Sequence, residues 1–120
     1  MTQNDKQLLL ITLCGMLPYG VKYQDRIDGG IHILSLGIIH HYDRFIPYLR
    51  PISSMTEEEK KEFQACHCVY ELHPDFQPMM CNLANELNMF DWLNAHHFDY
   101  RGLIEKGLAL EAPEGMYKIS

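Results

Sequence analysis

The feature that most constrains this chain is a change in its hydrophobic period near Gly20. Before that residue, apolar side chains are spaced as on a helix. After it, as far as Ile52, they alternate with polar side chains as on half-buried strands. Asp28-Gly29-Gly30 interrupts the alternation with residues that tolerate positive φ, which is typical of a β-hairpin. A helix followed by paired strands and further helices predicts an α+β protein.

The first element is predicted to be a helix over residues 3–16. Thr2 can cap it, and Asp5 complements the positive end of the helix. Its apolar residues occupy more than one face, so we expect a helix that is largely buried or that presents one face to a partner. Gly15 and Pro18 end it.

Residues 20–50 predict a small antiparallel β-meander or partial barrel. The bend between its halves is expected at Gly37. Pro47 and Pro51 bracket an extended segment that we expect not to be a central strand, because proline cannot donate to the ladder. The strands are expected at residues 21–27, 31–36, 38–42 and 44–46.

Two C-terminal helices flank this sheet in the prediction. Thr56 and Glu59 form a capping box, which predicts a helix from residue 56 to about residue 70. A second helix is expected over residues 82–97. The tail alternates glycines with apolar residues and predicts one helical turn and a short extended piece on the core. The length supports one core, so residues 1–120 are taken as a single domain.

The charge of the chain disfavours two classes of partner. Ten Lys and Arg against sixteen Asp and Glu give a net charge of −6, which makes a phosphate-binding surface unfavourable. No uncharged stretch is long enough to span a membrane, and Asp5 beside Lys6 does not fit the positive start of a secretory leader. We therefore expect a cytoplasmic, soluble protein whose four cysteines are reduced.

Three segments resemble a known group of proteins. They read LPYGV at residues 17–21, PYLRPISSMTEEE at residues 47–59 and DWLNAHHFDYRGLIEKGLAL at residues 91–110. In these blocks the chain resembles short proteins of unknown function that are common in phages, prophages and mobile elements of gut Bacteroidetes-type bacteria. Between residues 21 and 45 those relatives tend to be longer. The resemblance implies an origin and no activity.

Cysteine and histidine residues supply the candidates for a metal site. Zinc prefers four thiolate or imidazole ligands from closely spaced pairs. Neighbouring residues on a helix point about 100° apart, so Cys66 and Cys68 diverge and cannot chelate one ion together. The residues that would ligate a metal are Cys66, His67, Cys81 and His96, but buried structural thiols and a helix-end histidine are the simpler interpretation. We expect no metal and no cofactor.

The leading functional hypothesis is a non-catalytic interaction or accessory factor of phage or prophage origin. Its partner would be an unknown protein, with self-association as one possibility. No nucleophile or phosphate-binding motif is present in the sequence. A metal-dependent enzyme remains one alternative. The other is a nucleic-acid module on a basic, tyrosine-bearing sheet (Lys22, Arg26, Arg44 and Arg50 among Tyr23, Tyr42 and Tyr48), although pairing with Asp25, Asp28 and Asp43 explains the same residues.

Tyr100 and Arg101 are the candidate interaction residues. Phe98, Leu103 and Ile104 are apolar enough to anchor the tail on the core, and Asp99 can cap the next turn. Arg101 ends a long stretch without positive charge, so it is expected first to clasp a carboxylate. Display of Tyr100 and Arg101 to a partner is the alternative, since both residue types are enriched at binding hot spots.

Overall fold

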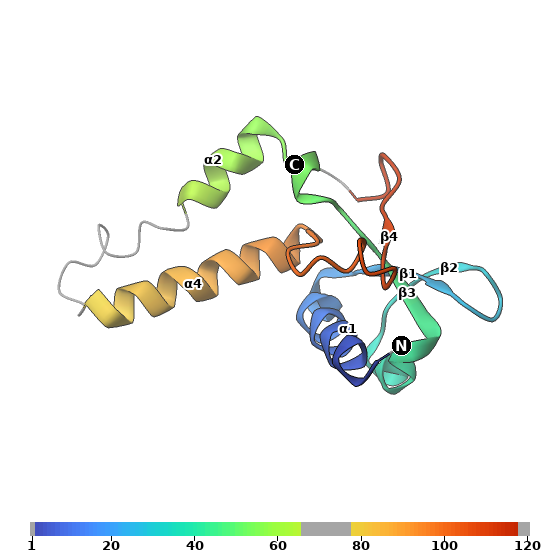
Figure 1. Cartoon of the computed structure of the whole chain (residues 1–120). Coiled ribbons are helices and arrows are strands. Elements are labelled where there is room, and N and C mark those ends of the chain that lie inside the picture. Colours follow the sequence, from blue (N-terminus) through green and yellow to red (C-terminus); the bar gives the residue numbers. More distant parts are fainter. Residues whose placement is uncertain (1, 66–77, 118–120) are drawn as a thin grey trace.

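The computed structural model describes residues 2–65 and 78–117, with the backbone alone for residues 43 and 78–85 (Figure 1). Helices and a four-stranded mixed sheet confirm the predicted α+β class. The sheet is open, and its strand order is β2-β1-β3-β4. In chain order the elements are α1 (Gln3–Met16), η1 (Leu17–Tyr19), β1 (Lys22–Asp25), β2 (Ile31–Ile33), η2 (Leu36–Arg44), β3 (Phe45–Leu49), η3 (Ile52–Ser54), α2 (Glu57–Ala65), α4 (Pro78–Ala95) and β4 (Leu110–Glu111).

Helix α1 begins and ends where the sequence predicts. The Thr2 hydroxyl accepts a hydrogen bond from the Asp5 N–H, and the Asp5 carboxylate accepts one from the Thr2 N–H, which completes a capping box. Leu9, Leu13 and Met16 are fully buried, whereas Ile11 on the opposite side is about half exposed. One face of α1 therefore packs on the core.

The hairpin is confirmed, and the strand expected at residues 44–46 is found as β3, one residue later and longer, but the strand expected at residues 38–42 is wrong. β1 pairs with β2 and with β3, antiparallel in both cases. Residues 36–44, in contrast, form the short 3₁₀ turns of η2. Ile38, Ile39 and Tyr42 pack against the core. Their spacing of three to four residues suits a helical turn as well as a strand, and packing against the core selects the turn.

Pro47 lies in a central strand, contrary to the prediction. The Arg26 N–H donates to the Arg44 carbonyl at 3.0 Å, so bonded pairs of the β1–β3 ladder fall on even-numbered residues. Pro47 faces Tyr23 at a non-bonded position, so its nitrogen points away from β1. β4 begins to pair only at Tyr48. Neither neighbour therefore needs the missing N–H.

The C-terminal half follows the prediction in outline. α2 begins after the predicted capping box, where the Thr56 N–H lies 3.0 Å from a Glu59 carboxylate oxygen. Its expected extension from residue 66 to residue 70 lies outside the described residues. α4 begins at Pro78, earlier than predicted. The short extended piece of the tail is β4, which runs parallel to β3, so the sheet is neither a pure antiparallel meander nor a partial barrel.

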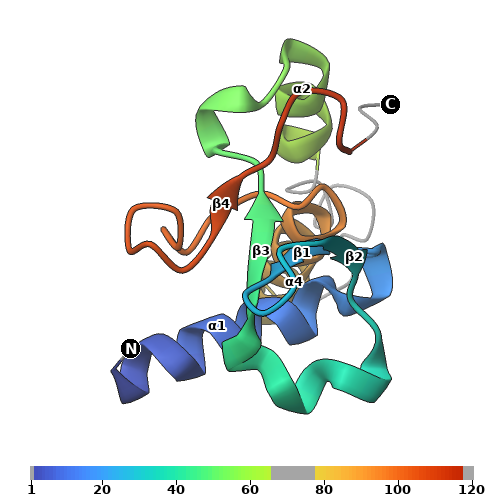
Figure 2. The same cartoon turned by 90° about the vertical axis from the view of Figure 1, so that its right-hand side faces the viewer.

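The core lies on one face of the sheet, which we call the inner face. Tyr23, Phe45 and Leu49 point there and pack with α1 and with the segment of residues 103–109. The opposite, outer face carries the alternate residues of each strand. β3 runs from the α1 end of the molecule toward α2 (Figure 2). The outer face therefore ends beside α2 (Figure 2), and β2 forms one of its edges.

Candidate functional site

A buried ion pair closes the α2 end of the outer face. Arg50 follows β3 directly and Glu59 lies in the first turn of α2. Both terminal nitrogens of Arg50 lie 2.7 Å from a carboxylate oxygen of Glu59, which is bidentate geometry. Their side chains are 7% and 1% exposed. These hydrogen bonds from the guanidinium lower the pKa of Glu59 to about 2.

Arg50 also joins this end of the sheet to the segment that follows α4. Its N–H donates to the His97 carbonyl and its carbonyl accepts from the Asp99 N–H, both at 2.8 Å. The guanidinium carbon lies 4.2 Å from the centre of the Phe98 ring, close enough for a cation–π contact. Arg50 therefore connects β3, α2 and the segment after α4.

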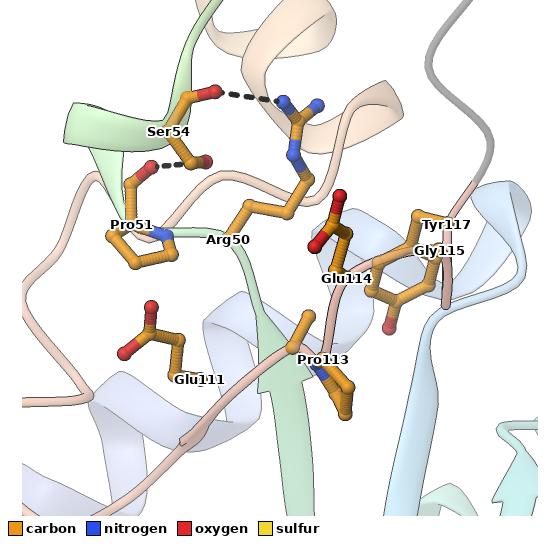
Figure 3. Close-up of a pocket in the computed structure, with 9 residues that line it drawn as sticks. Arg50, Pro51, Ser54, Glu111, Pro113, Glu114, Gly115 and Tyr117 are labelled. Carbon is orange, nitrogen blue, oxygen red and sulfur yellow. Dashed lines mark hydrogen bonds between the residues drawn. The ribbon is translucent and has the colours of Figure 1, made fainter.

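A pocket of about 300 Å³ lies beside this ion pair (Figure 3). Its walls come from the end of β3, from η3 and from residues 111–117. The Arg50 side chain extends toward Ser54, whose carbonyl accepts a hydrogen bond from it at 3.4 Å. Glu111 and Glu114 are exposed members of the rim.

Tyr117 bridges two strands at the base of the same pocket. Its hydroxyl accepts from the Lys22 N–H and donates to the Tyr48 carbonyl, each at 2.8 Å. It thereby occupies the next bonded position of the β1–β3 ladder. Burial raises the pKa of Tyr117 to about 12. The Arg50 guanidinium and the Tyr117 hydroxyl both have partners within the chain, so we assign them a structural role.

The β2 edge of the outer face is open and apolar. Ile31 and Ile33 lie on this face of β2 and are 53% and 61% exposed, and Ile27 and Leu36 beside the hairpin are each 74% exposed. β2 is also an edge strand of the sheet. We define Ile27, Ile31, Ile33 and Leu36 as the hairpin surface. The alternation in the sequence predicts a strand at Ile31 and Ile33 but not their exposure, because alternation does not show which face a second layer covers.

Of the metal candidates, only the His96 side chain belongs to the described part of the chain. Cys66 and His67 lie outside the described residues, as does the side chain of Cys81. His96 donates from Nδ1 to the Trp92 carbonyl at 2.9 Å and stacks on the Trp92 ring. No group of three possible ligands occurs among the described side chains. Elemental analysis of the purified protein tests the expectation that it holds no zinc.

His97 ends α4 through its backbone conformation. It adopts a φ of 61°, and the N–H groups of His97 and Phe98 donate to the carbonyls of Asn94 and Leu93, which is a Schellman motif. Its Nε2 donates to the Tyr19 carbonyl at 2.7 Å. Burial lowers the pKa of His97, which disfavours the imidazolium that would complement a helix C-terminus.

Tyr100 and Arg101 lie on the segment after α4, but Arg101 does not form the expected clasp. The Tyr100 hydroxyl donates to the Asn94 side chain at 2.8 Å. Arg101 is exposed, lies over the Tyr100 ring and forms no ion pair with a described residue. Asp99 does cap the next turn, where it accepts hydrogen bonds from the Leu103 and Ile104 amides. The clasping arginine is Arg50.

The basic residues of the sheet are engaged in contacts within the chain. Arg44 pairs with the buried carboxylate of Asp25 at 3.2 Å. The Lys22 ammonium donates to the Met116 carbonyl at 3.1 Å, and Arg50 is buried with its carboxylate. Arg26 is exposed. For Arg44, the structure therefore agrees with the expected pairing to an aspartate of the sheet and not with a side chain displayed to a phosphate backbone.

A carboxylate for Arg50 has a recognisable signal in the sequence. A short turn, Pro51 to Ser54, separates the arginine from a helix start that carries three glutamates. The capping-box position fixes the direction of Glu59 toward the chain that precedes the helix. A buried arginine needs a carboxylate partner, and Glu59 is the nearest glutamate whose side-chain direction the capping box indicates.

Comparison of the chain with protein-family models, with curated protein sequences and with the solved structures finds no match. The phage or prophage origin implied by the resemblance of residues 47–59 and 91–110 therefore stays a prediction. Within the described residues, none of the helices combines the length and the apolar character that crossing a bilayer requires.

Proposed function

We propose that this chain is a non-catalytic protein-interaction module that binds through the hairpin surface. The observation that carries the proposal is the coincidence of exposed apolar side chains with an unpaired strand edge. Ile31 and Ile33 are adjacent on one face of β2, and each leaves more than half of its surface in contact with water. Exposed apolar side chains on an open edge strand are a binding or aggregation surface unless a partner covers them.

The remaining surface supports this choice over a nucleic-acid module. Three of the four basic residues of the sheet contact acceptors within the chain, and the whole sequence is acidic. A phosphate backbone would have to displace these contacts against a net charge of −6. In this proposal the chain is a cytoplasmic accessory factor of phage or prophage origin, as its sequence resemblance implies.

Site-specific photo-crosslinking in bacterial cells tests the proposal. A photoreactive amino acid is placed at position 33 of the hairpin surface or, as the matched control, at position 11, which is also about half exposed. We expect a discrete crosslinked product from position 33 alone, and we expect Ile31→Lys to abolish it. Equal products from both positions, or none from position 33, would contradict the proposal.

A further inference from the structure

The geometry of the open edge points to a specific occupant. We propose that β2 pairs antiparallel with β2 of a second copy of this chain, so that two four-stranded sheets join into one continuous sheet. The inference rests on the proposed function and names the partner of the same surface.

The backbone of β2 alternates between its neighbour and the open edge. The Gly30 carbonyl accepts from the Asp25 N–H at 3.0 Å, and the Leu34 N–H donates to the Val21 carbonyl at 2.9 Å. His32 pairs with Tyr23 between these two bonds. The even-numbered residues therefore direct their backbone groups toward β1. Ile31 and Ile33 direct their N–H and C=O groups into the open edge.

These outward groups are symmetric about His32, which makes the edge self-complementary. When two copies of β2 meet antiparallel with a two-fold axis at His32, Ile31 of one copy lies opposite Ile33 of the other. Each such pair exchanges two backbone hydrogen bonds, so every outward N–H and C=O of Ile31 and Ile33 is satisfied. One patch that binds its own copy is the isologous contact of a two-fold dimer.

The side chains agree with this register. Ile31 and Ile33 share the outer face, so the pairing brings the same two isoleucines of both copies into one apolar cluster. Residues 30–34 read GIHIL and contain none of the lysine or proline residues with which natural edge strands prevent pairing. The opposite edge, β4, has two residues, one of which is Glu111. The sheet is protected at one edge and not at the other.

The strand pair between the two copies is short, and its length limits the affinity expected for the dimer. β2 spans three residues, so pairing it covers less than the roughly 1,600 Å² of a standard interface. Ile27 and Leu36 flank the strand and are the exposed apolar residues that can add to the contact. We therefore expect a reversible dimer whose population rises with protein concentration, not an obligate one.

Sedimentation analysis of the full chain over a range of about 5 to 500 µM tests the inference. Wild type is expected to shift from monomer to dimer as the concentration rises. Ile33→Pro is expected to stay monomeric, because it removes an N–H that points away from β1 and leaves the intramolecular ladder intact. Ile11→Lys replaces a matched exposed isoleucine of α1 and should dimerise as wild type does.

A disulfide test gives a second readout that does not depend on the proline variant folding. At the two-fold axis the His32 residues of the two copies form a non-bonded pair with Cα atoms about 4.5 Å apart, within disulfide range. In a background with the four natural cysteines changed to serine, His32→Cys should form a covalent dimer under mild oxidation. Ile11→Cys, on the exposed side of α1 and outside the hairpin surface, should not.

The outcomes separate the inference from the proposed function. A monomer at every concentration, with no disulfide dimer of His32→Cys, overturns the pairing. Dimerisation that survives Ile33→Pro but is lost in Ile11→Lys also overturns it, because the contact would then run through α1. If the pairing fails while position 33 still crosslinks a different protein, the proposed function stands. If that crosslink is absent too, both fail.

Discussion

Replacing Glu59 with glutamine is the most informative single change to this fold. The substitution keeps the shape of the side chain but removes its charge. Arg50 stays buried but loses one of its two hydrogen bonds to the carboxylate, because the NH₂ group of the glutamine then faces an N–H group of the guanidinium. The variant therefore isolates the electrostatic part of the connection between β3 and α2.

Two estimates of the stability lost in Glu59→Gln agree. Removing one partner of a buried ion pair typically costs about 3–5 kcal/mol, and both side chains here are more than nine-tenths buried. Lowering the pKa of Glu59 from 4.5 to about 2 corresponds to about 3 kcal/mol of folding free energy at roughly 1.4 kcal/mol per pKa unit. We therefore expect Glu59→Gln to lower the free energy of unfolding at pH 7 by about 3 kcal/mol.

The same pKa predicts how this loss depends on pH. A carboxyl whose pKa is depressed in the folded state contributes its stability above the unfolded pKa, near 4.5, and loses it as pH falls through the folded pKa, near 2. By pH 3 about 2 kcal/mol of the contribution is gone from the wild type. The gap between wild type and Glu59→Gln should therefore narrow to about 1 kcal/mol.

Urea denaturation followed by circular dichroism at pH 7, 5 and 3 measures both effects. Glu57→Gln is the matched control, because Glu57 pairs with Lys60 on the surface and its side chain is 85% exposed. That change is expected to alter the free energy of unfolding by less than about 0.5 kcal/mol. A difference at Glu59 below about 0.5 kcal/mol at pH 7, or one that does not change between pH 7 and pH 3, would refute the reasoning.

Three further predictions concern Tyr117 and the segment after α4. Tyr117→Phe leaves an N–H of β1 and a carbonyl of β3 without their shared partner, and should cost about 1–3 kcal/mol in urea denaturation. Asp99→Ala removes an acceptor of two backbone amides and should cost about 0.5–2 kcal/mol, whereas Asp99→Asn should restore part of it. Arg101→Ala should change the free energy of unfolding by less than about 0.5 kcal/mol, because its side chain is exposed. A larger loss of stability would show that Arg101 does clasp a carboxylate.

The parts of the fold that sequence predicts well are those with a local cause. The capping boxes at Thr2 and Thr56 and the glycine pair of the hairpin each depend on residues within four positions of one another. The 3₁₀ turns at residues 36–44 have no such local cause. Ile38 and Ile39 fit a strand or a turn equally well, and their packing against the core decides between the two.

The candidate site depends still more on distant contacts. Arg101 and Arg50 are each followed by residues that change the direction of the chain, and charge counting alone favoured Arg101 as the clasp. Arg50 lies at the end of the outer face because it directly follows β3. The turn η3 then reverses the chain, so that Glu59 in the first turn of α2 lies beside Arg50. A carboxylate and an arginine nine residues apart meet only because that turn has this geometry, which spacing does not reveal.

The different surroundings of the α2 end and of the β2 edge explain why the hairpin surface is the part of the sheet available to a partner. At the α2 end, the Arg50–Glu59 pair and the Tyr117 hydroxyl satisfy the buried polar groups and exclude an incoming strand. At the edge, β2 pairs with β1 alone among the described strands, and its isoleucines contact water. An edge strand with exposed apolar side chains has few buried contacts and is therefore among the parts of a sheet that open most readily. Pairing a further strand with the β2 edge would add backbone hydrogen bonds and bring apolar side chains against its isoleucines, so binding and local stability are coupled. Amide hydrogen exchange should therefore slow at Ile31 and Ile33 when the partner binds, while the amides at the α2 end keep the protection they already have.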